Sequence, residues 1–180
     1  MLLIDNTVNN LGIMKSHNMG LDKMKEVGAD WLIVLSAAVR FGEAGGLDFI
    51  EQIEKHQDCQ VINGSGRVMI EGVEKVMAIG WHLTAFNKAV FEAVGRWDEN
   101  FTPYGFDDVD LTLRIRKYFG DKLKWETFPC DSSHVSFSHS VQLAGVESPS
   151  TPRIAYFAEK WGRHPKAWRW EGFEHPFDNP

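Results

Sequence analysis

The sequence contains few cysteines and no long apolar run. Its 180 residues include 2 cysteines, Cys59 and Cys130, which form no Cys-x-x-Cys pair. Such sparse cysteine use is typical of reduced thiols, so we expect a cytoplasmic protein. The longest unbroken apolar stretch, residues 31–35, is far shorter than the roughly 20 residues that span a bilayer. Residues 1–4 lack the basic start of a signal peptide. We therefore expect neither a transmembrane segment nor a secretory leader.

Basic residues are too few and too scattered to coat nucleic acid. The chain has 19 Lys and Arg against 25 Asp and Glu, a net charge of −6, and its densest basic run is Arg114, Arg116 and Lys117. Phosphate binding needs clustered cations, so we expect no nucleic-acid partner. With 43% hydrophobic and 24% charged residues, the chain has the composition of one globular domain.

Short strand patterns alternate with helical patterns along the chain. Residues 2–5 and 31–35 are typical of buried strands, and between them Asn18 is placed to cap a helix that Gly28 ends. Further strands are predicted at 59–62, 67–70, 75–86 and 123–128. Further helices are predicted with Leu47, Ile50 and Ile53 on one face, at 88–94, at 107–119, and from a cap at Ser150 to Gly162.

This order of elements predicts an α/β fold with a mixed, mostly parallel sheet flanked by helices, because a strand, helix and strand in succession form a parallel pair. We assign residues 1–162 to this domain. Residues 163–180 mix tryptophan and phenylalanine with proline and charge and show no period. We expect this tail to pack on the domain or on a partner.

Three carboxylates, Asp107, Asp108 and Asp110, stand at the start of the helix predicted at 107–119. Acidic residues there cap a helix and complement its dipole, typically by about 0.3 to 1 kcal/mol. Asp110 and Arg114 are also spaced for an ion pair on the helix surface. The alternative is catalytic: a carboxylate held beside a bound substrate takes a proton from an attacking hydroxyl. Both interpretations remain open at this point.

The acidic segment resembles the signature of the family-two nucleotide-sugar glycosyltransferases of the GT-A fold. Residues 95–99 (Gly-Arg-Trp-Asp-Glu) and 107–111 (Asp-Asp-Val-Asp-Leu), followed by Arg114, occupy the places of that family's motif. Three weaker stretches agree in order and spacing. They are residues 3–6 (Leu-Ile-Asp-Asn), 12–21 (ending Asn-Met-Gly-Leu) and 156–162 (Tyr-Phe-Ala-Glu-Lys-Trp-Gly). The resemblance covers residues 2–162 and implies a GT-A-like fold with its site at the carboxyl ends of the strands.

The resemblance also implies roles for individual residues. Asp108 would be the general base, with Asp107 orienting it. The donor side would be formed by Asp5, Asn6 and Asn18, while Lys15, His17 and Arg40 are bases that could neutralise a diphosphate leaving group. The acceptor side would be formed by Trp81, His82 and Trp97, because aromatic faces stack on sugar rings. For the two tryptophans, packing in the core is an equal alternative.

The sequence departs from the family pattern at two places. The family's Asp-x-Asp motif holds Mn²⁺ or Mg²⁺, but residues 35–39 here are Leu-Ser-Ala-Ala-Val, without a carboxylate. His134 and His139 are substitute metal ligands, or ordinary loop histidines. The chain also begins at what resembles the family's second strand, so we expect a GT-A-like fold that lacks the family's first strand and helix.

Two functions are consistent with these observations. The first is transfer of a sugar, with inversion, from a nucleoside-diphosphate sugar to a glycan or other hydroxyl acceptor. The alternative is a catalytically inactive GT-A-like module that binds carbohydrate or protein, which the missing Asp-x-Asp favours. A third expectation concerns assembly. A partner chain or a second copy could complete the sheet beside the strand at residues 2–5, whose edge is otherwise hydrophobic.

Overall fold

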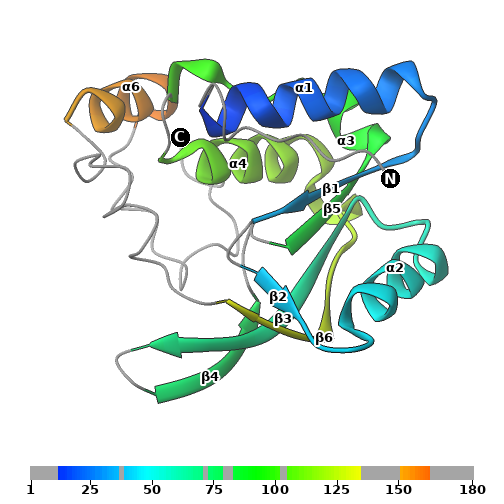
Figure 1. The fold of residues 1–180 in the computed structure, drawn as a ribbon. Coiled ribbons are helices and arrows are strands. Elements are labelled where there is room, and N and C mark those ends of the chain that lie inside the picture. The colour runs from blue at the N-terminus through cyan, green and yellow to red at the C-terminus, as the bar shows by residue number, and fades with distance from the viewer. Residues whose placement is uncertain are drawn as a thin grey trace.

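A six-stranded sheet and five α-helices make up the described part of the chain (Figure 1). The computed structural model describes residues 12–36, 39–70, 73–78, 83–101, 105–134 and 151–162. The strands are β1 (Trp31–Leu35), β2 (Val39–Phe41), β3 (Val61–Ile70), β4 (Val73–Ala78), β5 (Leu83–Asn87) and β6 (Trp125–His134). The helices are α1 (Ile13–Glu26), α2 (Gly45–Lys55), α3 (Lys88–Val94), α4 (Asp107–Phe119) and α6 (Thr151–Trp161).

Two of the predicted segments lie outside the described residues: the strand at 2–5 and the tail at 163–180. In the described part of the chain, no helix combines the length and the apolar character needed to cross a membrane.

The sheet is mixed, as predicted, but it is mostly antiparallel. Its order is β1-β5-β3-β6-β2, with β4 paired to β3, and only the pair of β3 and β6 is parallel. The prediction of a mostly parallel sheet was therefore wrong. The physical reason is the short connections in the middle of the chain. Only residues 71 and 72 separate β3 from β4, and a link that short permits only an antiparallel hairpin.

The strand directions bring particular ends of the helices together. Since β1 and β3 are both antiparallel to β5, and β6 is parallel to β3, the strands β1, β3 and β6 run in one direction. Five residues separate the end of α4 from the start of β6, and the two elements run in opposite directions (Figure 1). The helix α1 precedes β1 in the same way. The first turns of α1 and α4 therefore lie at the carboxyl ends of these three strands, on the left of Figure 1.

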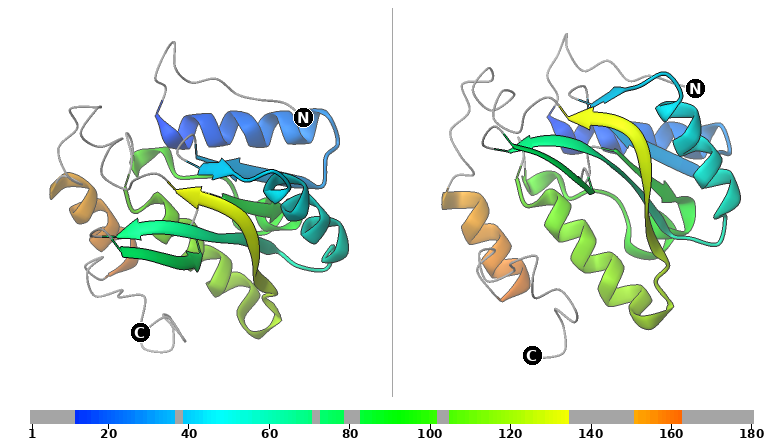
Figure 2. Two further views of the ribbon diagram at one scale, coloured as in Figure 1. Left: turned by 60° about the horizontal axis from the view of Figure 1, so that its bottom comes forward. Right: turned by 90° about the horizontal axis from the view of Figure 1, so that it is seen from below.

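Helices cover both faces of the sheet. On one face, α1, α3, α4 and α6 pack around a core that includes Phe86, Trp97, Leu111 and Phe157. On the other face, α2 is the helix in the described part of the chain, as the two views of Figure 2 show. It packs on the sheet through Phe49 and Ile53. This corrects the predicted face of α2, because Leu47 is 69% exposed. The rotation of α2 is set by Gly45, whose backbone approaches β6 too closely to leave room for a side chain.

Strand β1 lies at one edge of the sheet in the described part of the chain, and its Ile33 and Leu35 are 42% and 49% exposed. Exposed apolar edge strands are places where further strands pair. The expectation that a partner or a second copy completes the sheet beside the strand at residues 2–5 stays a prediction, because that strand lies outside the described residues.

The contact between α2 and β6 makes a test of the fold. A Cβ atom at Gly45 would lie 2.0 Å from the backbone oxygen of Asp131, whereas one at Gly46 would meet only the Phe41 ring at 3.8 Å. We expect Gly45→Ala to destabilise the protein by about 1–3 kcal/mol, as overpacking does. The neighbouring Gly46→Ala should stabilise it by about 0.5–1 kcal/mol through helix propensity. Urea denaturation followed by circular dichroism measures both, and equal effects would contradict this packing.

Candidate active site at the start of α4

The first turn of α4 begins with an unusual backbone. Gly105 and Phe106 have φ angles of 108° and 67°, and Phe106 is the one non-glycine residue with positive φ among the described residues. A bulky residue in this region is strained and is typical of functional sites. The sharp turn brings the amide of Gly105 to the carboxylate of Asp107, whose Oδ1 accepts its hydrogen bond at 3.0 Å. Nothing in the sequence alone signals this strain.

Asp107 and Asp108 form an acid pair whose pKa values are both raised. Burial raises the pKa of Asp107 to about 6, and the charge of Asp108 adds to that effect. Burial likewise raises the pKa of Asp108. Apart from backbone amides, no donor contacts either carboxylate in the described residues, and Asp108 Oδ1 accepts only from the amide of Val109, at 2.8 Å. An acid with a pKa near 6 is ionised at pH 7 yet more basic than an ordinary aspartate.

Asp110 differs from the acid pair because it is buried and fully paired. Its side chain is 0% exposed. One oxygen accepts from Arg114 at 2.9 Å, and the other lies 2.7 Å from Lys160 Nζ. The indole of Trp161 donates to that second oxygen at 2.9 Å. The predicted pair of Asp110 and Arg114 thus forms, but in the protein interior rather than on the helix surface.

Lys160 connects two segments that the sequence had singled out separately. Besides Asp110 it binds Asp98, at 2.6 Å. Asp98 also accepts from the hydroxyl of Tyr156 at 2.6 Å and from the amide of Asn100 at 3.0 Å. Burial acts to raise the pKa of Asp98, but the hydrogen bonds from Lys160, Tyr156 and Asn100 outweigh it and lower that pKa to about 2. The motifs at 95–99 and 156–162 give no sign in the sequence that they meet.

Asn18 is a core residue and not a donor ligand or a helix cap. The helix α1 begins at Ile13, so Asn18 lies inside it. Its amide nitrogen donates to the carbonyl of Trp97 at 3.0 Å and to Glu99 at 2.9 Å, and its oxygen accepts from the amide of Trp97 at 3.0 Å. Asn18 is buried, and these bonds use its side chain to fasten the 97–99 segment to α1.

Trp97 is likewise part of the core and not a sugar platform. It is 1% exposed, with its ring edge-on to Phe86 and tilted against Phe91, so neither ring face is open to a sugar. His17 packs on the same indole, with the ring centroids 4.8 Å apart. Burial lowers the pKa of His17 to about 4, so this imidazole is neutral at pH 7 and has no charge to offer a diphosphate.

Two predicted cations lie at the same end of the sheet as the acid pair. Lys15 is exposed in the first turn of α1, and Arg40 is exposed on β2. The register pairs Val39 with His134 and Arg40 with Ser133, so β2 begins where β6 ends. Because β6 ends beside the start of β2, this corner lies at the carboxyl ends of the strands. The first turn of α4 lies at the same end, since α4 and β6 run in opposite directions.

Several predicted site residues fall outside the described part of the chain. They are Asp5, Asn6, Trp81, His82 and His139. For His134 the structure describes only its place at the end of β6.

The described residues show no cluster of three or more metal-ligating side chains, counting carboxylate, histidine and cysteine groups. The sequence after β1, Ser-Ala-Ala at 36–38, contains no hard anionic ligand.

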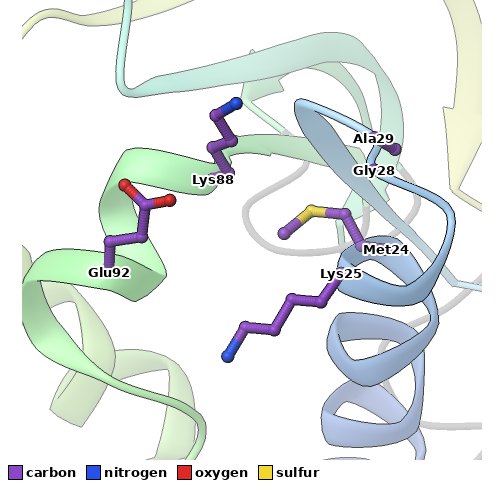
Figure 3. Close-up of a pocket in the computed structure, with 6 residues that line it drawn as sticks. All are labelled: Met24, Lys25, Gly28, Ala29, Lys88 and Glu92. Carbon is purple, nitrogen blue, oxygen red and sulfur yellow. The ribbon is translucent and has the colours of Figure 1, made fainter.

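A small pocket lies at the opposite end of the sheet, where α1 ends and α3 begins (Figure 3). Its volume is about 210 Å³. The lining residues are Met24, Lys25, Gly28, Ala29, Lys88 and Glu92. Lys88 is already paired with Asp30 at 2.6 Å. The pocket is therefore separate from the acid pair, and no motif in the sequence pointed to it.

The chain matches no family model and no curated protein. The geometry of the site and the resemblance of its motifs are therefore the basis for assigning a function.

The raised pKa of Asp107 predicts a gain of stability on neutralisation. A carboxyl whose folded-state pKa exceeds its unfolded value of about 3.9 destabilises the folded state once the pH rises above that value. Asp107→Asn keeps the acceptor for the Gly105 amide and removes the charge. We expect it to stabilise the protein by about 1–3 kcal/mol at pH 7. The gain should fade as the pH falls from 6 to 4, as urea denaturation across this range would measure. The matched control is Asp121→Asn, at an exposed aspartate just after α4.

The hydrogen bonds of Asn18 make the second prediction for this region. Asn18→Ala removes the side-chain partner of a buried amide and carbonyl of Trp97, which costs about 2–3 kcal/mol. Lys25→Ala, on an exposed position of the same helix, should change the free energy of unfolding by less than about 0.5 kcal/mol. Thermal and urea unfolding distinguish them. A donor-binding role for Asn18 would instead predict little loss of stability.

Proposed function

We propose that this protein is an inverting glycosyltransferase related to family two of the GT-A fold, acting on a nucleoside-diphosphate sugar and a hydroxyl acceptor. One observation carries the proposal: two adjacent carboxylates at the carboxyl ends of the strands, with raised pKa values and no cation in contact among the described residues. Helix capping alone accounts neither for this burial nor for the lack of a cation beside the pair in the described part of the chain. The resemblance of residues 95–116 to the family signature supplies the reaction class.

In the proposed reaction, Asp108 accepts the proton of the acceptor hydroxyl. The hydroxyl oxygen forms a bond to the anomeric carbon as the bond from that carbon to the diphosphate oxygen breaks. A single in-line displacement inverts the configuration, and the nucleoside diphosphate leaves with the electron pair. Asp107 orients its neighbour, and burial raises the pKa of Asp108.

The leaving diphosphate requires positive charge. Lys15 and Arg40 both lie at the end of the sheet that holds the acid pair, and both are exposed. They are the side chains that we assign to this role, in place of the metal for which the described residues offer no ligand set. The mechanism accordingly gives no step to a metal ion.

The alternative, a catalytically silent module that binds carbohydrate or protein, is favoured by the missing Asp-x-Asp motif at residues 35–39. Isothermal titration with a panel of nucleoside-diphosphate sugars, with and without Mn²⁺, separates the two functions. Donor binding without Mn²⁺, weakened at least about tenfold by a combined Lys15→Ala and Arg40→Ala variant, supports the transferase. Failure of every donor to bind under both conditions would contradict it, and a glycan-binding screen would then test the silent module.

The role of Asp108 predicts a specific kinetic loss. Asp108→Asn should lower kcat by about 10²–10⁴-fold, because general base catalysis contributes about that much, while donor affinity stays nearly unchanged. Release of nucleoside diphosphate measures turnover, and the anomeric proton signals of the product report inversion. Asp121→Asn, at an exposed aspartate just after α4, should keep full activity. A fully active Asp108→Asn enzyme would remove this residue from the base role.

A further inference from the structure

Four charged side chains form a closed network behind the acid pair. Lys160 of α6 lies between Asp98 and Asp110, at 2.6 Å and 2.7 Å. Arg114 holds the other oxygen of Asp110, and its second guanidinium nitrogen donates to the carbonyl of Val94 at 2.6 Å. The two negative charges of the aspartates balance the two positive charges of Lys160 and Arg114, so the network is neutral as a whole.

The network lies one helical turn from the acid pair. Asp107 and Asp110 are three residues apart, so their side chains lie on the same face of α4. The charge of Asp110 adds to the raised pKa of Asp107, after burial and the charge of Asp108. Any change in the neutralisation of Asp110 therefore acts on the acid pair through a partly buried and weakly screened path.

We propose that Lys160 is a positioning residue for the acid pair. By bridging Asp98 and Asp110, it holds the first turn of α4 against α6 and neutralises the carboxylate one turn along the helix. The role in catalysis rests on the proposed function, whereas the electrostatic coupling does not. Lys160, which follows Asp108 by 52 residues in the sequence, thereby sets the pH at which the acid pair becomes a base.

The hydrogen-bonding needs of Asp98 and Asp110 do not by themselves explain why Lys160 lies between them. The carboxylate of Asp110 already has a donor on each oxygen without it, Arg114 on one and Trp161 on the other. Asp98 likewise has Tyr156 and Asn100. What Lys160 alone adds is the second positive charge. Without it, two buried or half-buried acids would share the single charge of Arg114.

The direction of the shift in the titration midpoint distinguishes electrostatic coupling from a purely structural role of Lys160. Lys160→Met leaves one excess negative charge near the acid pair and should raise its titration midpoint by roughly half a pH unit or more. Asp98→Asn leaves one excess positive charge and should lower the midpoint by a similar amount. Lys160→Arg keeps the charge and should restore the parent midpoint. Loosening of α6 alone would move the first two variants in the same direction.

The experiment is a titration of the whole chain labelled with ¹³C at the aspartate carboxyl carbons. The signals of the acid pair are assigned by Asp107→Asn and Asp108→Asn, and circular dichroism checks that each variant is folded. Opposite shifts in Lys160→Met and Asp98→Asn, with recovery in Lys160→Arg, support the proposal. Shifts of one sign, or midpoints unchanged in both variants, overturn it.

Failure of this inference is distinguishable from failure of the proposed function. The titration needs no substrate, so opposite shifts in a protein that binds no donor would keep the coupling and reject the transferase. If the protein does transfer sugar, the acid limb of kcat/KM should move with the titration midpoint in each variant. If the enzyme is active but the acid limb of its kcat/KM profile is the same in both variants, the role of Lys160 is rejected and the proposed function is kept.

Discussion

The buried carboxylate of Asp110 is the interaction on which the arrangement of the site depends. A charge taken out of water destabilises a fold unless it is paired and hydrogen-bonded. Asp110 meets this condition only because α4 supplies Arg114 and α6 supplies Lys160 and Trp161. Since Lys160 also binds Asp98, one buried acid brings together the loop before α4, the start of α4 itself and a helix much later in the chain. The position of the candidate base follows from that requirement.

Carboxylates that are close in sequence have opposite electrostatic surroundings. Asp98 and Asp110 contact cations, and the pKa of Asp98 is lowered to about 2. The acid pair contacts only backbone amides among the described residues, and its pKa values are raised. Stable ion pairs fix a structure, whereas an unpaired acid near neutrality exchanges protons readily. The same run of acidic residues therefore provides both the scaffold and the candidate catalytic group.

Local signals predicted the helices well. The bounds expected for α3 and α4 agree with the structure, and the bounds of α6 agree to within a residue at its amino end, because caps, apolar spacing and terminal glycines act within one or two turns. The prediction that Asn18 caps a helix was wrong because it, too, used only local signals. Its side chain is typical of a cap, yet tertiary contact with the backbone of Trp97 places it inside α1. Strand direction was beyond local reasoning, because pairing depends on which distant segments meet.

Local sequence patterns were enough to establish an α/β chain with an acidic helix start, since composition, period and capping are properties of neighbouring residues. The sequence also contained the segments that resemble a sugar-transferring family. Which of the three acids is paired, and which two are not, became known from the folded arrangement of α4 and α6. That distinction depends on burial and on a lysine 50 residues from Asp110, and distances across the fold are not written in any local pattern.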